Sequence, residues 1–259
     1  MILDKIAEQR KIQLKREMER TPFWKIKKAA ERAGAPKDFK GALQKQGLSV
    51  IAEVKKSSPS KGLICRDFHP DKIAGRYEKA GADAVSVLTE EAFFQGSLKA
   101  LREVRAAVSL PILRKDFIFS NYQIYEARAF GADAILLIAA MLDSKTLKKF
   151  KAIADSLGLA CLMEAHNERE LVKVLSAGAE IVGINNRDLR TFEVDPGTTV
   201  RLSKMLPPGK ILVSESGIRN RADMETAARA GADAVLIGET LMKSSDPDKV
   251  LRKLRGTKS

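Results

Sequence analysis

The sequence predicts an α/β fold, a (β/α)8 TIM barrel with an N-terminal helical extension, from three observations. One motif occurs four times, with a glycine that ends a helix, a small residue, an acidic residue and an apolar strand; its glycines are Gly81, Gly131, Gly178 and Gly231. These glycines are 50, 47 and 53 residues apart, a period that fits two βα units each. A further apolar strand precedes each copy of the motif, which brings the expected strands to eight.

The length and composition of the chain fit one large domain with an appendage. With 259 residues and 44% hydrophobic content, the chain can bury a sizeable core, and α/β barrels commonly occupy this length undivided. We therefore expect residues 1–47 to form a helical extension packed on the barrel. Residues 48–259 are expected to form the barrel, which carries the catalytic groups.

The extension is predicted to contain two helices. Apolar residues recur with helical spacing from Leu3 to Met18, and Thr21-Pro22 ends the pattern, which predicts a helix over residues 3–20. A second helix is expected over about residues 23–33, before the link at residues 34–36. Because the extension holds few large apolar residues, its apolar stripe should pack on the barrel.

Strands and helices alternate through the rest of the chain. Strands are expected at residues 49–55, 84–89, 110–115, 134–139, 159–164, 181–185, 211–216 and 233–238. Helices are expected at residues 70–80, 97–108, 121–130, 144–157, 168–177 and 221–230. A doubly wound open sheet would show the same alternation, but no Gly-x-Gly-x-x-Gly turn follows the first strand.

The net charge of +13 is concentrated at the two ends of the chain. Residues 1–48 carry +7 and residues 243–259 carry +4, which leaves the centre near neutrality. Nucleic-acid binders often interleave aromatic and basic residues, whereas the extension offers only Phe23, Trp24 and Phe39. We expect a solvated basic surface that attracts anionic ligands, and no nucleic-acid partner.

The sequence shows no signal for export or membrane insertion. Its first residues become charged too early for a secretory signal, and the longest apolar run, residues 134–142, is far shorter than a membrane span. Cys65 and Cys161 lack the neighbours that a disulfide framework or a metal site requires. We therefore expect a soluble cytoplasmic protein with reduced thiols and no membrane contact.

Polar side chains gather where the expected strands end. Glu53 and Lys55 follow Ile51 on one face of the first strand, which suggests an acid–base pair at the barrel mouth. The carboxyl ends of the other strands meet at the same mouth. They bring Lys115 on the third strand, Glu164 on the fifth, Asn185 and Arg187 on the sixth, and Glu215 and Ser216 on the seventh.

Lys115 and Glu164 are the strongest candidates for proton transfer. Lys115 follows the apolar segment 110–113, and apolar surroundings can lower the pKa of an ammonium group. Glu164 lies between Met163 and Ala165, where the pKa of a carboxyl group can rise. A single charged residue at a strand end is usually a solvated loop residue, but five strands that share the feature favour a common site.

A phosphate site is expected after the last two strands. Gly217 follows the seventh strand and Gly238 ends the eighth. Backbone N–H groups beside glycine, together with a short helix N-terminus, favour bound dianions at this place in barrels. The carboxylate of Glu239 would repel phosphate, so only its N–H is expected to face the ligand.

Neither a metal ion nor a cofactor is expected. His69 lies in a Phe68-His69-Pro70 turn and His166 begins a helix, without a second histidine or a carboxylate cluster at ligand spacing. The sequence also lacks a Gly-x-x-x-x-Gly-Lys-Ser/Thr nucleotide loop. His69 is expected to be structural, whereas His166 is near enough to Glu164 for an indirect role.

In combination, these motifs resemble those of the indole-3-glycerol phosphate synthase family. The matching segments are Ile51-Ala52-Glu53-Val54-Lys55, residues 57–60, Val87-Leu88-Thr89-Glu90, residues 94–97, residues 111–117, Glu164, residues 183–189, residues 214–218 and Leu236-Ile237-Gly238. The resemblance covers almost the whole chain, including the basic extension. Glu239 departs from it, because many members carry Ser or Thr there, and this argues against a side-chain contact with phosphate.

The resemblance implies a cofactor-free ring closure of 1-(2-carboxyphenylamino)-1-deoxyribulose 5-phosphate to indole-3-glycerol phosphate, with release of CO2 and water, in tryptophan biosynthesis. It makes Lys115 the general acid and Glu164 its partner in the dehydration. Lys55 would hold the substrate carboxylate, and Glu53 would orient the lysines. The implied substrate contacts are Asn185, Arg187, Glu215 and Ser216 for the anilino and hydroxyl region, Phe94 and Leu136 for the aromatic ring, and Ser58, Gly217, Gly238 and Glu239 for the phosphate.

Three alternatives remain open at this point. Another phosphate-binding barrel, such as phosphoribosylanthranilate isomerase, would need a different acid–base pair at its strand ends. A Schiff-base aldolase would use Lys115 or Lys55 as its amine, and a basic nucleic-acid-binding protein would lose affinity without the charged ends. We expect a monomer that acts on a small anionic substrate, with residues 57–62 as a mobile loop over the site.

Overall fold

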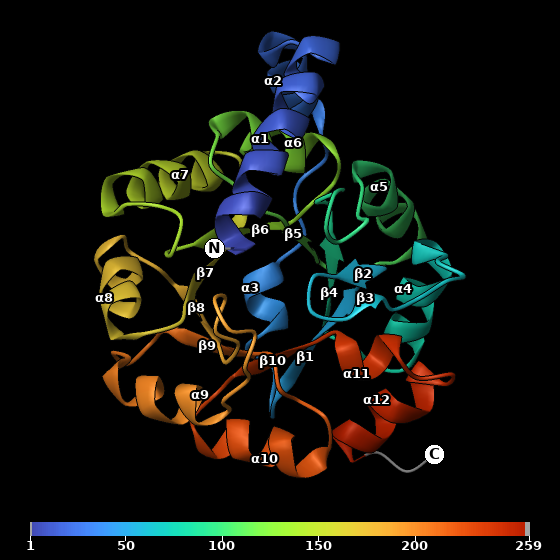
Figure 1. Ribbon diagram of the computed structural model, residues 1–259, viewed down its shortest axis with the longest axis vertical. Coiled ribbons are helices and arrows are strands. Elements are labelled where there is room, and N and C mark those ends of the chain that lie inside the picture. Colours follow the sequence, from blue (N-terminus) through green and yellow to red (C-terminus); the bar gives the residue numbers. More distant parts are fainter. Residues whose placement is uncertain (1, 257–259) are drawn as a thin grey trace.

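The computed structural model describes residues 2–256 and shows eight parallel strands closed into a barrel (Figure 1). The barrel strands are β1 (Ser49–Val54), β4 (Ala84–Leu88), β5 (Ile112–Lys115), β6 (Ala134–Ile138), β7 (Ala160–Ala165), β8 (Ile181–Asn185), β9 (Ile211–Glu215) and β10 (Ala234–Ile237). Consecutive barrel strands pair in parallel, and β10 pairs with β1 to close the ring. The predicted fold is confirmed, and each predicted strand matches an observed strand to within two residues at either end.

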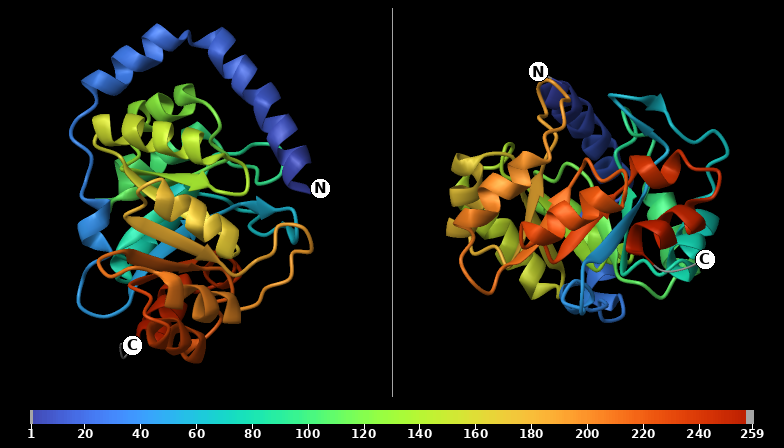
Figure 2. Two further views of the ribbon diagram at one scale, coloured as in Figure 1. Left: turned by 90° about the vertical axis from the view of Figure 1, so that its left-hand side faces the viewer. Right: turned by 90° about the horizontal axis from the view of Figure 1, so that it is seen from below.

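A ring of helices surrounds the strands (Figures 1 and 2). The predicted helices correspond to α4 (Pro70–Lys79), α5 (Leu98–Ala107), α6 (Asn121–Ala129), α7 (Ser144–Ser156), α8 (Glu168–Ser176) and α10 (Arg221–Arg229). The sequence did not predict α3 (Phe39–Ala42), α9 (Gly197–Leu202) with its 3-10 continuation η1 (Ser203–Met205), α12 (Pro247–Arg255) or the hairpin of β2 (Ser57–Ser58) and β3 (Gly62–Leu63). For α11 (Glu239–Met242) it predicted only a short helix N-terminus, without bounds. Most of these elements are too short for a periodic signal.

The motif that occurs four times connects neighbouring strands at the end of the barrel opposite the mouth. Its glycines have φ values between 83° and 91°, a left-handed conformation that suits glycine after a helix. Three of its acidic residues accept a backbone N–H from a neighbouring strand: Asp83 from Val50 at 2.9 Å, Asp133 from Ile112 at 2.7 Å and Asp233 from Leu212 at 2.7 Å. The repeated pattern therefore serves the stability of the barrel.

The core has an inner layer within the barrel and an outer layer between strands and helices. The inner layer includes buried side chains from five strands: Ile51, Leu113, Leu162, Val213 and Leu236. Side chains two residues apart on a strand share a face. The alternation that fills the barrel therefore also aims the next residues of the same strands, Glu53, Lys115, Glu164, Glu215 and Gly238, at the mouth.

The N-terminal helices α1 (Ile2–Arg20) and α2 (Phe23–Arg32) form an arch against one side of the barrel, seen in the left view of Figure 2. Phe23 of α2 packs edge-on against Tyr125 of α6, with 5.2 Å between ring centroids. At the other end of the arch, Ile2 and Leu3 of α1 reach the barrel mouth. Both predicted helices are present, while the division of the chain at residue 47 stays a prediction.

Two further observations bear on the chemistry that is open to the protein. No helix within residues 2–256 is long and apolar enough to cross a membrane. Cys65 and Cys161 are free thiols, and burial raises the pKa of the Cys161 thiol to about 12. Cys161 is therefore protonated and unreactive at neutral pH.

Candidate active site

A cavity of about 460 Å³ lies at the C-terminal ends of the barrel strands. It is lined by every residue that the sequence assigned to the site: Glu53, Lys55, Ser58, Phe94, Lys115, Leu136, Glu164, Asn185, Arg187, Glu215, Ser216, Gly217, Gly238 and Glu239. Residues of α1 and of the β2–β3 hairpin complete its wall. The structure thus brings together the polar groups of six strands or strand ends, as expected for the mouth of such a barrel.

Lys115 is the centre of the charged cluster. From the end of β5, its Nζ lies 3.0 Å from Oε2 of Glu164 on β7, and it also donates to the carboxylate of Glu215 on β9. The side chains are 13%, 3% and 1% exposed, respectively. One ammonium is therefore held between two carboxyl groups in a largely buried setting, where such interactions are stronger than in bulk water.

The sequence-based expectations for the pKa values of Lys115 and Glu164 are wrong in sign. Burial lowers the pKa of Lys115, but Glu164, Glu215 and Glu53 together raise it above its usual value. Burial raises the pKa of Glu164, but Lys115 and His166 hold it well below its usual range. Lys115 is therefore an ammonium with a proton to donate at neutral pH, and Glu164 is a carboxylate able to accept one.

Glu215 differs from Glu164 although both contact Lys115. Burial raises its pKa, Lys115 lowers it and the nearby Glu164 raises it again, to about 7 overall. Its Oε1 is buried without a hydrogen-bond partner among the described residues. A Cβ at Gly183 on the adjacent strand would lie only 2.2 Å from this atom, so the glycine makes the room that Glu215 needs.

Glu53 and Lys55 form a second charged pair on β1 and its end. The Nζ of Lys55 donates to Oε1 of Glu53, and both side chains are largely buried. A Cβ at Gly238 would lie 2.2 Å from this Oε1 and 2.9 Å from Nζ of Lys55. Gly238 was predicted only from phosphate binding, yet its lack of a side chain also accommodates this pair.

Asn185 and Ser216 are joined across β8 and β9. The Oγ of Ser216 donates to Oδ1 of Asn185 at 2.9 Å, and the backbone N–H of Arg187 donates to the same oxygen at 3.0 Å. Ser216 has a φ of 66°, which is uncommon for a residue with a side chain. Non-glycine residues in this region often occur at functional sites, and here the turn carries the hydroxyl to the cavity wall.

The end of the cavity proposed for phosphate combines Ser58, Gly217, Gly238 and the first turn of α11. Glu239 begins this turn, and its carboxylate lies 2.6 Å from Lys243, 3.7 Å from Arg187 and 3.9 Å from Lys61. Burial raises the pKa of Glu239, but these cations, Lys243 foremost, lower it overall. The carboxylate is therefore engaged by cations, and both these cations and the backbone N–H groups at the start of α11 can favour an anion at this end of the cavity.

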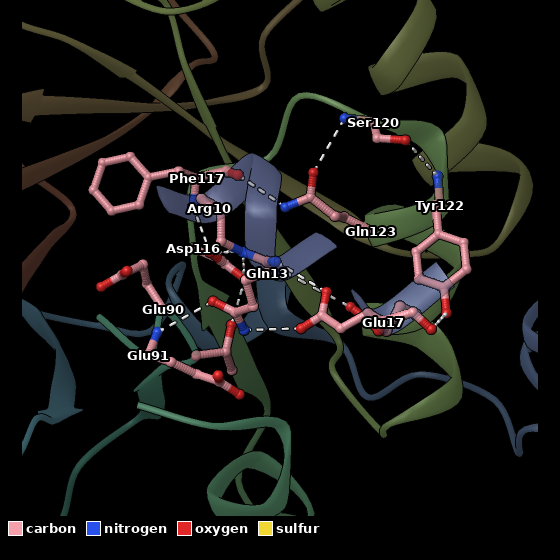
Figure 3. Close-up of polar contacts among 12 residues, drawn as sticks. Arg10, Gln13, Glu17, Glu90, Glu91, Asp116, Phe117, Ser120, Tyr122 and Gln123 are labelled. Atoms are coloured by element: carbon pink, nitrogen blue, oxygen red, sulfur yellow. Dashed lines mark hydrogen bonds and ion pairs between the residues drawn. The ribbon is translucent and has the colours of Figure 1, made fainter. Parts of the chain in front are cut away.

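A buried charge network connects α1 with the strand that carries Lys115 (Figure 3). Arg10 of α1 is fully buried and donates to Asp116 at 3.0 Å and to Glu17 at 2.9 Å. Asp116 also accepts from Arg114 at 2.8 Å and from Thr89 at 2.7 Å. The sequence alone did not predict a role for Arg10, although a charged residue within the apolar stripe of the predicted helix was a signal for one.

The structure does not assemble a metal site from its described part. Within residues 2–256, no group of three or more His, Cys, Asp and Glu side chains is arranged to hold a metal ion. His69 lies 2.8 Å from Asp67 in an exposed turn away from the cavity. His166, by contrast, lies 3.3 Å from Oε1 of Glu164 and is thus in contact with the site.

Comparisons with known proteins agree on one family. The family described as indole-3-glycerol phosphate synthase matches residues 3–254. The indole-3-glycerol phosphate synthase of Acetivibrio thermocellus is 50% identical over 98% of this chain and 99% of its own length, and that of Endomicrobium trichonymphae is 49% identical over 98% and 100%. Among solved structures, 3-hexulose-6-phosphate synthase from Salmonella typhimurium has a TM-score of 0.66 at 12% identity, covering 81% of this chain and 97% of that chain. This last likeness concerns the fold alone.

Proposed function

The chain belongs to the indole-3-glycerol phosphate synthase family, and on this premise we propose how its cavity performs the reaction. The protein is a lyase that closes the ring of 1-(2-carboxyphenylamino)-1-deoxyribulose 5-phosphate to form indole-3-glycerol phosphate in tryptophan biosynthesis. CO2 and water leave. The observation that carries the assignment of roles is the position of Lys115 between Glu164 and Glu215.

The first half of the reaction is assigned to Lys115. The aromatic carbon that bears the carboxylate attacks the ketone carbon, and Lys115 protonates the ketone oxygen as the new bond forms. The carboxylate then departs as CO2, and its bonding electrons restore the aromatic ring. The apolar wall formed by Phe94 and Leu136 holds the ring and favours loss of charge from the carboxylate.

The second half is a dehydration in which Glu164 participates. The former ketone oxygen takes a second proton and leaves as water, and a proton is lost from the neighbouring carbon, which Glu164 accepts. Two protons enter and one returns, so each turnover takes up one proton. The same count follows from charge, because a carboxylate is converted to neutral CO2.

The remaining groups position the substrate. Lys55 holds the substrate carboxylate and Glu53 orients Lys55, with which it is already paired. Polar groups of β8 and β9 hold the anilino nitrogen and hydroxyl groups: Asn185, Arg187, Glu215 and Ser216. The phosphate lies at Ser58, Gly217, Gly238 and the N–H of Glu239, where a helix begins.

We also propose that the protein acts as a cytoplasmic monomer without a nucleic-acid partner. The substrate is a small phosphorylated molecule, and the cavity is large enough for it. The family match disfavours the isomerase and aldolase alternatives, since it covers nearly the whole chain. Trapping with borohydride would reveal a Schiff base if Lys115 or Lys55 acted as an amine nucleophile.

The test is turnover of the carboxyphenylamino substrate, followed by indole fluorescence. Lys115→Ala should lower kcat by at least about 100-fold and leave substrate binding nearly unchanged. Lys99→Ala removes an exposed lysine of α5 and should retain wild-type turnover. Folded wild-type protein without turnover would overturn the function, and unchanged turnover in Lys115→Ala would remove Lys115 from its role.

A further inference from the structure

The proposed reaction requires a proton from solvent in every cycle. Lys115 and Glu164 supply and accept protons within the cavity, but neither group can provide the net proton that each turnover takes up. Both side chains are largely buried, and bound substrate would cover them further. A path for protons that does not pass through the substrate would therefore serve the reaction.

His166 lies on the side of Glu164 that faces away from Lys115. Its Nε2 is 3.3 Å from Oε1 of Glu164, whereas Lys115 contacts the other oxygen, Oε2. Its Nδ1 is 2.9 Å from Oε2 of Glu170 in the first turn of α8. Because an ionised carboxylate only accepts, Nδ1–H donates to Glu170. Nε2 is buried, makes no hydrogen bond among the described residues and faces Glu164, so it is the ring atom available to exchange a proton with that carboxylate.

These residues lie between two adjoining hollows of the molecule, whose linings share Leu3, Asn185 and Leu189. Glu164 lines the active-site cavity, whereas His166 and Glu170 line a second hollow of about 1240 Å³ between α8 and the segment after β8. Other side chains along this hollow are well exposed, among them Arg190 at 71% and Arg201 at 63%. Along the row itself the exposed fraction of the side chain rises from 3% at Glu164 through 10% at His166 to 16% at Glu170, so Glu170 is the member closest to solvent.

We propose that Glu170 and His166 form a proton relay that delivers the solvent proton of each turnover to Glu164. The inference rests on the proposed function. His166 passes its Nε2 proton to Glu164, which gives it to the departing hydroxyl group. Glu164 then accepts the carbon-bound proton and returns it to Lys115, 3.0 Å away. His166 regains its proton from solvent through Glu170, so the cycle closes with one proton taken up.

The charges of the site give the relay its direction. Burial lowers the pKa of His166, but Glu164 and Glu170 raise it to about 10, so His166 holds a proton at neutral pH. Burial has the largest effect on the pKa of Glu164, and the positive charge of Lys115 has the second largest. The charge of Lys115 lowers this pKa. Once Lys115 has protonated the substrate, this charge is gone and Glu164 becomes a better proton acceptor. The first proton transfer thus prepares the second.

A purely structural role for Glu170 accounts for only part of this geometry. Asn167 caps α8 by accepting the N–H of Glu170 at 3.0 Å, and its amide donates to Oε1 of Glu170 at 2.8 Å. This reciprocal pair is a helix cap. Oε2 of Glu170 also accepts the backbone N–H of His166 at 2.9 Å, which belongs to the same structural role. The cap does not require the imidazole of His166 between two carboxylates, with its Nδ1 on Glu170 and its Nε2 facing Glu164.

The decisive experiment measures CO2 release and indole formation separately in His166→Ala. Since ring closure uses the proton of Lys115, CO2 release in the first turnover should keep its wild-type rate. Indole formation should lag, and kcat should fall about 100-fold with little change in KM. Added imidazole, which fits the space left by the ring, should restore kcat as its concentration rises.

Two variants on α8 complete the test. Glu168→Gln removes an exposed carboxylate from the same helical turn and should keep wild-type kcat. Glu170→Gln retains a side chain that can cap the helix. Its kcat should fall and should depend on buffer concentration. This variant tests the relay if His166→Ala fails to fold. Turnover within twofold of wild type in both relay variants, or a loss that imidazole does not restore, would overturn the relay. Absence of turnover in the wild type would instead remove the proposed function.

Discussion

Glu215 is a buried carboxyl group whose charge depends on pH near neutrality. Its pKa is raised to about 7 from an ordinary 4.5, so the folded protein favours the protonated form. This contribution to stability is fully present below pH 4.5 and is lost as the pH rises through 7. In Glu215→Gln, the free energy of unfolding should lack this decline, which amounts to a few kcal/mol at most.

The measurement is urea unfolding of both proteins between pH 4 and pH 8. The quantity of interest is the difference between wild type and Glu215→Gln, because the other titrating groups are common to both. The wild type should lose stability relative to the variant across this range. Parallel profiles would show that the pKa of Glu215 is not raised in the folded state.

Gly238 is predicted to be needed because a side chain would displace the Glu53–Lys55 pair. In Gly238→Ala, the new Cβ would meet Oε1 of Glu53 at 2.2 Å, so the pair must shift. We expect kcat/KM to fall at least about tenfold, since small displacements of binding groups are costly to catalysis. Steady-state kinetics of the wild type and Gly238→Ala measure this change in kcat/KM.

Gly75→Ala is the matched control for Gly238→Ala. Gly75 lies inside α4, and a Cβ there meets nothing within 4 Å. It should leave the kinetics unchanged and stabilise the protein by about 0.5–1 kcal/mol, because alanine suits a helix interior better than glycine. A Gly238→Ala enzyme as active as Gly75→Ala would contradict the steric argument.

At the scale of elements, α1 is joined to the active site through Arg10. Arg10→Met would leave Asp116 with Arg114 and Thr89 but without its partner on α1. Loss of a partner from a buried ion pair should cost about 3 kcal/mol of the free energy of unfolding. Because Asp116 follows Lys115 directly and Ile2 and Leu3 line the cavity, kcat/KM should also fall, by about tenfold.

Thermal unfolding and kinetics of Arg10→Met should be compared with those of Arg16→Met. Arg16 is an exposed arginine of the same helix, so its replacement should change stability by less than about 0.5 kcal/mol. If the two variants behave alike, the network in Figure 3 does not fix α1.

Elements formed by interactions between residues close in the sequence could be predicted, whereas contacts between residues far apart in the sequence could not. Strands and barrel helices were predictable because alternation and Gly-capped repeats are local signals. The β2–β3 hairpin was not, because its strands have only two residues each. Arg10 could not be assigned because its partner Asp116 is 106 positions away in the sequence.

For the whole molecule, the sequence predicted which side chains meet at the mouth but not their electrostatics. Strand parity and barrel closure suffice to gather Lys115 and Glu164 in one cavity. Their pKa values depend on how many opposite charges approach each group, and the dominant partners come from other strands or loops. The apolar sequence neighbours of Lys115 therefore predicted the wrong direction.

The net charge of +13 should speed the capture of a substrate that carries phosphate and carboxylate. Raising the ionic strength from about 0.01 M to about 0.15 M shortens the screening length from about 30 Å to about 8 Å. We expect kcat/KM to fall severalfold over this range while kcat stays constant, because screening acts on approach and binding and not on the buried groups.

The location of charge can be tested with two lysines that contribute equally to the net charge. Lys61 lies at the mouth, 3.9 Å from Glu239, whereas Lys79 ends α4 on the outer surface. If the field at the mouth guides the substrate, Lys61→Gln should lower kcat/KM at low salt more than Lys79→Gln, and the difference should vanish at high salt. Equal effects of the two variants would mean that only the total charge matters. A kcat/KM that does not respond to salt would exclude electrostatic capture altogether.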